Sequence, residues 1–488
     1  DIKQAFLNVG IAAQHRDYLR FLWYDLQAED EEVVIYRFLR VVFGITSSPF
    51  LLNGTVRHHL SYYLEKEQEI VKRIRDDLYV DDLVSGCNAL EEGKALYDRS
   101  KAILSEAGLN LRKWVTNDKD LAEYIGLREN KDSKLLSNDN DMTYFEATSP
   151  NTTVEHKVVL GVGWDTTSDE LVFRFDDLVS KCDTIKHTKR NLLSISASIF
   201  DPLGLIAPVT AKIKTIFQLL CKDKLDWDEI IPEKIAVVWN KFVEELKHLA
   251  EVRHSRFVFS SKFSSGSRIE LHGFCDSSKE VYCAVVYLRL VYQGAVHVCF
   301  LASKTKVAPL KALTIPRLEL LGCLLLSKLI REVLLGVEKR IKLHDIFCWT
   351  DSEVALCWVN GKEKRWEPWV ENRVVAIRKV VDREKWHFVK GEVNPADIPT
   401  RLSSSLKECF SGCWFRGPLM LWSQELEVDR VKAGCVDKNS LVGRVDVEVP
   451  AEVVNFSNTT EKGTPNYSSC SISAVIDCTR YSSLKKLL

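Results

Sequence analysis

Acidic residues near the start of the sequence could hold divalent metal ions. Asp81 and Asp82 are adjacent, and the short apolar stretches 78–80 and 83–84 beside them predict two strands joined by a tight turn. Asp1 offers a third carboxylate. Carboxylate oxygens are the ligands that Mg²⁺ prefers, and two such ions can activate a hydroxyl group and stabilise a leaving phosphate. Adjacent aspartates are also common in solvated turns, so the pair alone leaves both interpretations open.

A second set of acidic residues is spread over a longer part of the chain. Asp276 and Asp351 each end a strand-like stretch, so their carboxylates can converge if the two strands are neighbours. Glu319 stands between them in a leucine-rich helical segment, where a charge is costly unless it reaches solvent or a cation. Asp397 adds a fourth carboxylate. Two metal ions held by this set could activate water for phosphodiester hydrolysis.

The pattern of apolar residues indicates which elements would position these carboxylates. Short strands and helices alternate over 1–130, and a polar loop follows at 130–150. The stretch 158–175 has strand-like alternation, and 189–249 is mostly helical. Between 268 and 402 we expect three strands, a long helix, a strand, a helix, a strand and a final helix. That order is typical of an α/β layer on a mixed sheet.

Composition excludes some classes of protein. A chain of 488 residues is too long for one core, and its 46% hydrophobic and 28% charged residues describe an ordinary soluble protein without a membrane-spanning run. The net charge of -1 decides little, because clustered carboxylates can hide a basic groove. The 14 cysteines follow no zinc or secretory pattern, so free thiols in a reducing compartment are expected.

Three segments together resemble the polymerase motifs of reverse transcriptases. Tyr79-Val80-Asp81-Asp82 resembles the Y-x-D-D hairpin of that family. Asp1 with Phe6 resembles its first catalytic motif, an Asp followed five residues later by an aromatic residue. Phe43-Gly44-Ile45-Thr46-Ser47-Ser48-Pro49 resembles its F-G-x-x-x-S-P segment. The motifs stand in the family's order and near its spacing.

This resemblance implies roles for further residues in binding nucleotide and template. Phe6 would be the steric gate that disfavours a ribose 2′-hydroxyl, the alternative being an ordinary core residue. Phe43 and Gly44 would let the backbone approach the incoming nucleotide and the template. Lys113 would lie near the triphosphate or would be a surface lysine. The family's basic fingers would precede Asp1, so we expect little or no DNA synthesis from the chain as given.

The later carboxylates resemble those of ribonuclease H. Asn394-Pro395-Ala396-Asp397-Ile398-Pro399-Thr400-Arg401 is similar to the N-x-A-D-x-x-S-R signature of retroelement ribonucleases H, and the order Asp276, Glu319, Asp351, Asp397 is similar to that family's. The resemblance implies two Mg²⁺ per site, with Mn²⁺ as a substitute, and cleavage of the RNA strand of an RNA–DNA hybrid, by the segment 265–405 alone as well. His387 compares with a mobile histidine of some ribonucleases H, or is a residue on a strand face.

Taken together, the chain resembles part of the Pol polyprotein of a BEL/Pao-type LTR retrotransposon. The region from about 150 to 260, with the segment 198–208 inside it, is similar to the region between polymerase and ribonuclease H in these elements. That region is labelled a peptidase, but no Asp-Thr/Ser-Gly motif is present here. Trp227 and Trp239 of this region are expected to be core residues. The implied fold is α+β and multidomain. It comprises a reverse-transcriptase palm with an antiparallel sheet and helices at 1–130, a thumb and connection region at 131–264, a ribonuclease H-like α/β domain at 265–405, and a linker towards an integrase at 406–488.

The implied activity is RNA-directed DNA polymerase with ribonuclease H. The implied partners are an RNA template, a DNA primer, RNA–DNA hybrid and dNTPs, with protease and integrase domains outside this chain and no membrane. The implied location is the cytoplasm, within a virus-like particle, or the nucleus. A start at Asp1 rather than Met predicts a fragment of a polyprotein. The alternatives are a degenerate or domesticated nucleic-acid-binding fragment without catalysis, and a structural scaffold; the intact carboxylates favour an enzyme.

Overall fold

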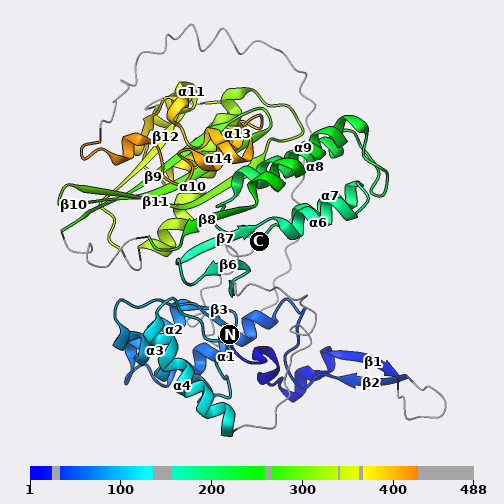
Figure 1. The fold of residues 1–488 in the computed structure, drawn as a ribbon, viewed down its shortest axis with the longest axis vertical. Coiled ribbons are helices and arrows are strands. Elements are labelled where there is room, and N and C mark those ends of the chain that lie inside the picture. Colours follow the sequence, from blue (N-terminus) through cyan, green and yellow to red (C-terminus); the bar gives the residue numbers. More distant parts are fainter. Residues whose placement is uncertain (25–32, 136–156, 259–265, 339–340, 362–365, 427–488) are drawn as a thin grey trace. The chain divides into compact units, whose positions relative to one another are not determined.

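The computed structural model describes residues 1–24, 33–135, 157–258, 266–338, 341–361 and 366–426 (Figure 1). These residues form two compact units. The first holds Asp1–Leu160 with Trp164–Asp169, and the second holds the remaining described residues. None of the described helices is both long enough and apolar enough to cross a membrane.

The first unit is mainly helical, with two antiparallel strand pairs, β1–β2 and β3–β4, among its described residues. Apolar residues on one face of each helix make its core, among them Val56, Leu60, Ile74 and Leu104. The elements are η1 (Ala5–Asn8), η2 (Ala13–Tyr18), β1 (Arg20–Tyr24), β2 (Val33–Arg37), α1 (Ser48–Ser61), α2 (Gln68–Asp77), β3 (Leu78–Tyr79), β4 (Asp82–Leu83), α3 (Leu90–Glu106) and α4 (Lys119–Leu135).

A five-stranded mixed sheet is the centre of the second unit (Figure 1). Its order is β11-β10-β9-β12-β13, in which β9, β10 and β11 are antiparallel, β12 runs parallel to β9, and β13 runs parallel to β12. The mixed sheet predicted from the sequence is therefore confirmed. Its strands are β9 (Arg268–Ser277), β10 (Val281–Tyr292), β11 (Ala295–Val307), β12 (Asp345–Thr350) and β13 (Trp386–Phe388).

Helices cover both faces of this sheet, because neighbouring residues of a strand point to opposite faces and both sets are apolar. Cys275 and Ala284 share a core with Leu326 of α10 (Ile315–Val337). Phe274 faces the other way and packs with residues of α8 and α9. Of the remaining elements, β5 (Lys157–Val159) belongs to the first unit and β6 (Val162–Asp165) is divided between the two units. The others belong to the second unit: β7 (Glu170–Arg174), α6 (Asp176–Thr184), α7 (Lys189–Ser198), α8 (Ala207–Lys222), α9 (Glu233–Leu249), β8 (Glu251–Ser255), α11 (Glu353–Asn360), α12 (Pro368–Arg378), η4 (Arg383–Lys385), η5 (Gly391–Val393), α13 (Asp397–Thr400), α14 (Leu406–Ser411) and η6 (Leu419–Trp422).

The helices α8 and α9 belong to the same unit as the sheet, whereas the sequence suggests a separate region at 131–264. Val209 of α8 and Trp239 of α9 lie in one core with Phe274 and Tyr287 of the sheet. The backbone also joins them, because the Ser303 N–H of β11 donates a hydrogen bond to the Leu203 carbonyl just before α8 (2.8 Å). The expected boundary near residue 264 is thus not a boundary between the two units.

Of the two tryptophans expected in the core of this region, one is buried. Trp239 has no exposed surface, as predicted. Trp227 is 46% exposed, so that prediction is wrong. Its ring instead lies under the charged groups of Lys189 and Arg190, at 5.0 and 5.9 Å from the ring centroid. A tryptophan at the surface can make favourable cation–π contacts on its ring face without being buried in a core.

Residues 406–426 pack into the second unit and do not form the linker predicted from residue 406. Trp414 is fully buried, and its indole Nε1 donates a hydrogen bond to the Leu205 carbonyl (2.8 Å). The Tyr287 hydroxyl donates to the Trp414 carbonyl (2.5 Å), and the buried Arg289 guanidinium donates to the Leu421 carbonyl (2.8 Å). This segment therefore completes the core on the α8 side of the sheet, and the prediction is wrong for 406–426. Residues 427–488 lie outside the described residues.

Candidate metal centre

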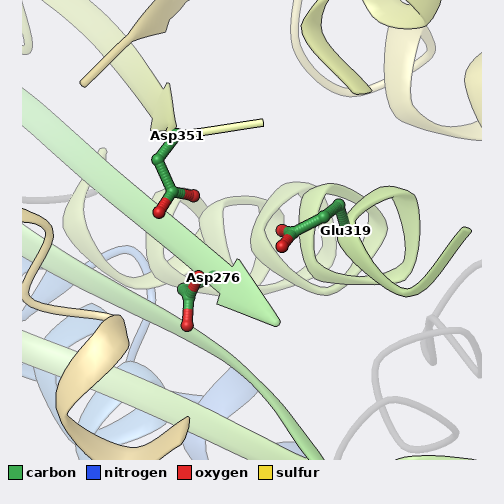
Figure 2. Close-up of side chains that lie close together, drawn as sticks. All are labelled: Asp276, Glu319 and Asp351. Atoms are coloured by element: carbon green, nitrogen blue, oxygen red, sulfur yellow. The ribbon is translucent and has the colours of Figure 1, made fainter. Parts of the chain in front are cut away.

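Three of the four later carboxylates come together at one end of the sheet (Figure 2). The parallel pairing of β9 with β12 sets Cys275 opposite Thr350, so the residues that follow, Asp276 and Asp351, lie side by side. Glu319, from the N-terminal part of α10, points towards both of them. One carboxylate oxygen from each of the three residues lies within 4.8 Å of the others.

The environment disfavours negative charge on all three carboxyl groups in the absence of a cation. Burial raises the pKa of Glu319 to about 10, with further contributions from Asp276 and Asp351. Burial also raises the pKa of Asp351 to about 6, with Asp276 adding to the rise, and raises the pKa of Asp276. Like charges held together away from water need a compensating positive charge. The site should therefore bind a proton or a metal ion strongly.

Two oxygens of the site are ready to accept a ligand. Oε2 of Glu319 and Oδ1 of Asp351 are buried and accept no hydrogen bond from the described residues. Buried polar atoms are nearly always paired, so two orphaned carboxylate oxygens in one cluster point to a missing partner. Oxygen ligands, negative charge and short separations fit a hard divalent cation such as Mg²⁺ or Mn²⁺.

Side chains of the last predicted motif hold this cluster in place. The Thr400 hydroxyl donates a hydrogen bond to Oδ2 of Asp276. The Asn394 amide donates to the Cys275 carbonyl (3.0 Å), which ties the motif to the end of β9. A Cβ on Gly391 would lie 2.9 Å from Oδ2 of Asp351, so a larger residue there would push this carboxylate out of its position. Thr400 and Asn394 both belong to the segment similar to the N-x-A-D-x-x-S-R signature, which is the sequence signal for their part in the site.

Asp397, the fourth predicted ligand, is beside the cluster but not one of the three converging groups. Its Oδ2 lies 2.5 Å from Nε of Arg401, an ion pair across one helical turn. Its charge still acts on the site, since it is among the causes that raise the pKa of Asp276 and Asp351. Asp397 therefore contributes negative charge here, with its carboxylate occupied by Arg401.

His387 lies on a strand, in agreement with one of the two alternatives. It belongs to β13, and its ring packs 5.2 Å from the Trp349 ring and 5.7 Å from the Phe347 ring. It is not among the side chains that converge with the three carboxylates. An aromatic strand face accounts for its position.

The carboxylates of the first unit are held near one another by backbone contacts. The Ile2 N–H donates a hydrogen bond to the Asp81 carbonyl (2.8 Å), and Asp82 pairs with Tyr79 across the β3–β4 turn. Burial raises the pKa of Asp81, and Asp82 adds to the rise. Asp1, Asp81 and Asp82, all described, do not form a cluster as tight as that of the second unit. Nε of Arg112 lies 3.7 Å from Oδ2 of Asp1.

The other residues expected to bind nucleotide or template are placed as follows. Phe6 is buried and its ring meets that of Phe43 edge to face, with centroids 5.0 Å apart; Phe43 is 66% exposed. Gly44 has a φ of +83°, a conformation that favours glycine. Lys113 is exposed.

A protein-family model described as "Pao retrotransposon-like RNaseH-like domain" matches residues 188–352. This range begins before the sheet, takes in α7, α8 and α9, and contains Asp276, Glu319 and Asp351. The second unit thus carries a retrotransposon-type RNase H-like region. The range also agrees with the packing of these helices on the sheet.

Two solved structures are similar to parts of the chain. The N-terminal RNase H domain of a Mycobacterium tuberculosis protein, solved as a fusion with maltose-binding protein, is 16% identical; the match covers 28% of this chain and 94% of that chain, with a TM-score of 0.20. RNase H1 from the halophilic archaeon Halobacterium salinarum is 14% identical, with coverages of 30% and 98% and a TM-score of 0.19. The curated proteins contain no match to the chain.

Proposed function

We propose that the second unit is a metal-dependent nuclease that hydrolyses the RNA strand of an RNA–DNA hybrid. The observation that carries this proposal is the buried group Asp276, Glu319 and Asp351, with two carboxylate oxygens that accept no hydrogen bond from the described residues. The matching RNase H-like family model supports the choice of substrate. The alternatives of a binding fragment or a scaffold give no reason to bury three repelling carboxylates.

Some residues of the site would bind the metal ion, and others hold these ligands in place. Asp276, Glu319 and Asp351 would hold Mg²⁺ or Mn²⁺, as one ion or as a pair. When bound, such an ion polarises the scissile phosphate and lowers the pKa of a water molecule. Thr400 occupies one oxygen of Asp276 and leaves the other for the ion. Asp397 adds negative charge close by, which strengthens the attraction for a cation.

The test is a titration of Mg²⁺ and Mn²⁺ into the full chain with four labelled substrates of one sequence: RNA–DNA hybrid, RNA duplex, DNA duplex and single-stranded RNA. Metal-dependent cleavage confined to the RNA of the hybrid is expected. The variant Glu319→Gln keeps the shape of the side chain and should remove cleavage. Absence of cleavage at every metal concentration would overturn the proposal.

A second activity is proposed for the first unit, namely RNA-directed DNA synthesis. The supporting observation is the backbone link between Ile2, which follows Asp1, and Asp81 of the turn, which brings the predicted polymerase motifs together. Asp1, Asp81 and Asp82 would bind Mg²⁺, and Phe6 would contact the sugar of a dNTP on an RNA template with a DNA primer. Location in a virus-like particle, association with protease and integrase domains, and the palm fold itself belong to this proposal.

Primer extension on an RNA template tests the polymerase. We expect little synthesis from the chain, because efficient synthesis needs basic groups that hold the triphosphate. Asp82→Asn should remove whatever synthesis the chain shows. Synthesis that survives Asp82→Asn would exclude this turn as the metal site.

A further inference from the structure

An ion pair holds the fourth carboxylate of the site, beside the three that converge. Oδ2 of Asp397 lies 2.5 Å from Nε of Arg401, which follows it by one helical turn. The side chain of Arg401 is 61% exposed, whereas that of Asp397 is 21% exposed. The guanidinium can therefore move into solvent, while the carboxylate stays at the edge of the site.

The main chain of Asp397 is fixed close to the converging carboxylates. The Asp397 N–H donates a hydrogen bond to the Asn394 carbonyl (3.1 Å), and the Asn394 amide donates to the Cys275 carbonyl (3.0 Å), next to Asp276. The Thr400 hydroxyl contacts both the Asp397 carbonyl (2.9 Å) and the Asp276 carboxylate. A change of partner at the Asp397 carboxylate would thus involve its side chain rather than the main chain.

The charge of Asp397 acts on all three members of the cluster. After burial, which is the main cause, Asp397 is among the groups that raise the pKa of Asp276, Glu319 and Asp351. The charge of Arg401 lowers the pKa of Asp276. Interactions between charges weaken with distance, so the Asp397 carboxylate lies near the cluster and Arg401 offsets part of its effect.

Charge balance makes the role of Asp397 depend on the number of bound ions. The three converging carboxylates, when ionised, carry more negative charge than one divalent ion balances and less than two such ions need. Oε2 of Glu319 and Oδ1 of Asp351 accept no hydrogen bond from the described residues, so they can bind a first ion without any change at Asp397. A fourth carboxylate would balance a second ion, but Arg401 neutralises it while the pair exists.

We propose that Arg401 is a positioning residue that holds Asp397 away from the metal site, so that a second divalent ion binds only when Arg401 releases this carboxylate. This inference rests on the proposed nuclease function, from which it takes the three-carboxylate site. The first ion binds to Asp276, Glu319 and Asp351 with the ion pair intact. The second ion competes with a guanidinium, so it binds more weakly and its site fills at a higher metal concentration.

The experiment counts the ions bound by the full chain, without nucleic acid, from the electron paramagnetic resonance signal of free Mn²⁺. Asp81→Asn and Asp82→Asn are present in every protein, so that the acidic turn of the first unit contributes no binding. The measured quantity is the dissociation constant of the second ion divided by that of the first, because a general change in charge shifts both constants together. In Arg401→Gln this ratio should fall about fivefold, the upper range of what an ion pair at a surface contributes.

Three further variants separate the ion pair from the charge of Arg401 alone. In Asp397→Asn the second ion should bind more weakly still, and adding Arg401→Gln should not recover it, since the partner is already lost. Arg317→Gln removes an arginine two residues before Glu319 that pairs with Glu367, and should leave the ratio unchanged. Arg401→Lys keeps a cation beside Asp397 and should retain most of the weakness of the second site.

A purely structural role for Arg401 would lower the unfolding temperature without moving the ratio, and that result would overturn the proposal. The same fivefold fall in the Asp397→Asn background, or a single bound ion in every folded variant, would overturn it as well. Hydrolysis of RNA–DNA hybrid gives a separate measurement, because the Mg²⁺ concentration for half-maximal cleavage should fall about fivefold in Arg401→Gln. If the Mn²⁺ ratio falls as expected but no protein cleaves the hybrid, the nuclease function is wrong and the role of Arg401 at the metal site remains.

Discussion

The two units hold their acidic residues in different ways. In the second unit, Asp276 and Asp351 end strands of a five-stranded sheet whose two faces are covered, and Glu319 comes from a helix packed on that sheet. In the first unit, Asp81 and Asp82 lie at a pair of two-residue strands, β3 and β4. A sheet that is covered on both faces can hold like-charged side chains close together before a metal ion binds. In a short hairpin, the approach of the carboxylates would depend more on the binding of the ion itself.

The strongest test of this comparison is whether the five-stranded sheet folds without the layers that cover it. The segment 265–405, expected from the sequence to cleave alone, lacks α8, α9 and Trp414 and exposes one face of the sheet. We therefore expect this segment to be unfolded and inactive, and 161–426 to unfold cooperatively. Trp414→Ala in the full chain should cost about 3–5 kcal/mol. Circular dichroism melting measures both, and a cooperative, active 265–405 would refute the argument.

Single carboxylate substitutions separate the two units by activity. Asp351→Asn should reduce hybrid cleavage by about a hundredfold or more, since it removes a charged ligand, while Asp82→Asn should leave cleavage unchanged. Initial rates with saturating Mg²⁺ give the comparison, and calorimetry checks that both variants fold. Loss of cleavage in Asp82→Asn would mean that the hairpin takes part in the hydrolysis.

The free energy needed to hold the three carboxyl groups together without a metal ion can be measured from the pH dependence of unfolding. The folded-state pKa of Glu319 is raised from 4.5 to about 10, so without metal this group stabilises the second unit at low pH. That contribution is lost as the pH rises from about 4.5 towards 10. Glu319→Gln should therefore stabilise the metal-free unit by about 1–3 kcal/mol near pH 8.5.

With Mg²⁺ the unchanged chain should be more stable than Glu319→Gln, because the carboxylate binds the ion and the amide binds it poorly. Thermal unfolding with EDTA and with Mg²⁺, across pH, provides the measurement. If the unfolding temperatures of the unchanged chain and of Glu319→Gln in EDTA depended equally on pH, Glu319 would already be ionised without a cation.

The smallest expected effect concerns the orientation of one carboxylate. Thr400→Val removes the hydrogen bond to Asp276, which opposes the rise of its pKa by burial. The pKa should rise further, so the acid limb of the pH–rate profile should move to higher pH and the rate should fall about 10-fold. Thr400→Ser keeps the hydroxyl and should restore the profile. An unshifted limb in Thr400→Val would make Thr400 a packing residue only.

Much of the metal centre could be predicted because its signals are local. Asp276 and Asp351 stand at the ends of two strand-like stretches, and Glu319 is a charge in a leucine-rich helix. The involvement of Arg401 was visible as well, since it stands one helical turn after Asp397. The burial of Trp414 was not predictable, because its partner Leu205 is 209 residues earlier and no periodicity marks either residue.

The hydrogen bond between Trp414 and Leu205 also sets an order of events during synthesis. The second unit cannot close its core until residue 414 has emerged from the ribosome, 209 residues after Leu205. At about 5–20 residues per second this interval is roughly 10–40 s. During that time the apolar face of α8, and later that of β10, is exposed to chaperones and to other nascent chains. A slow, late closure of high contact order follows from this one contact.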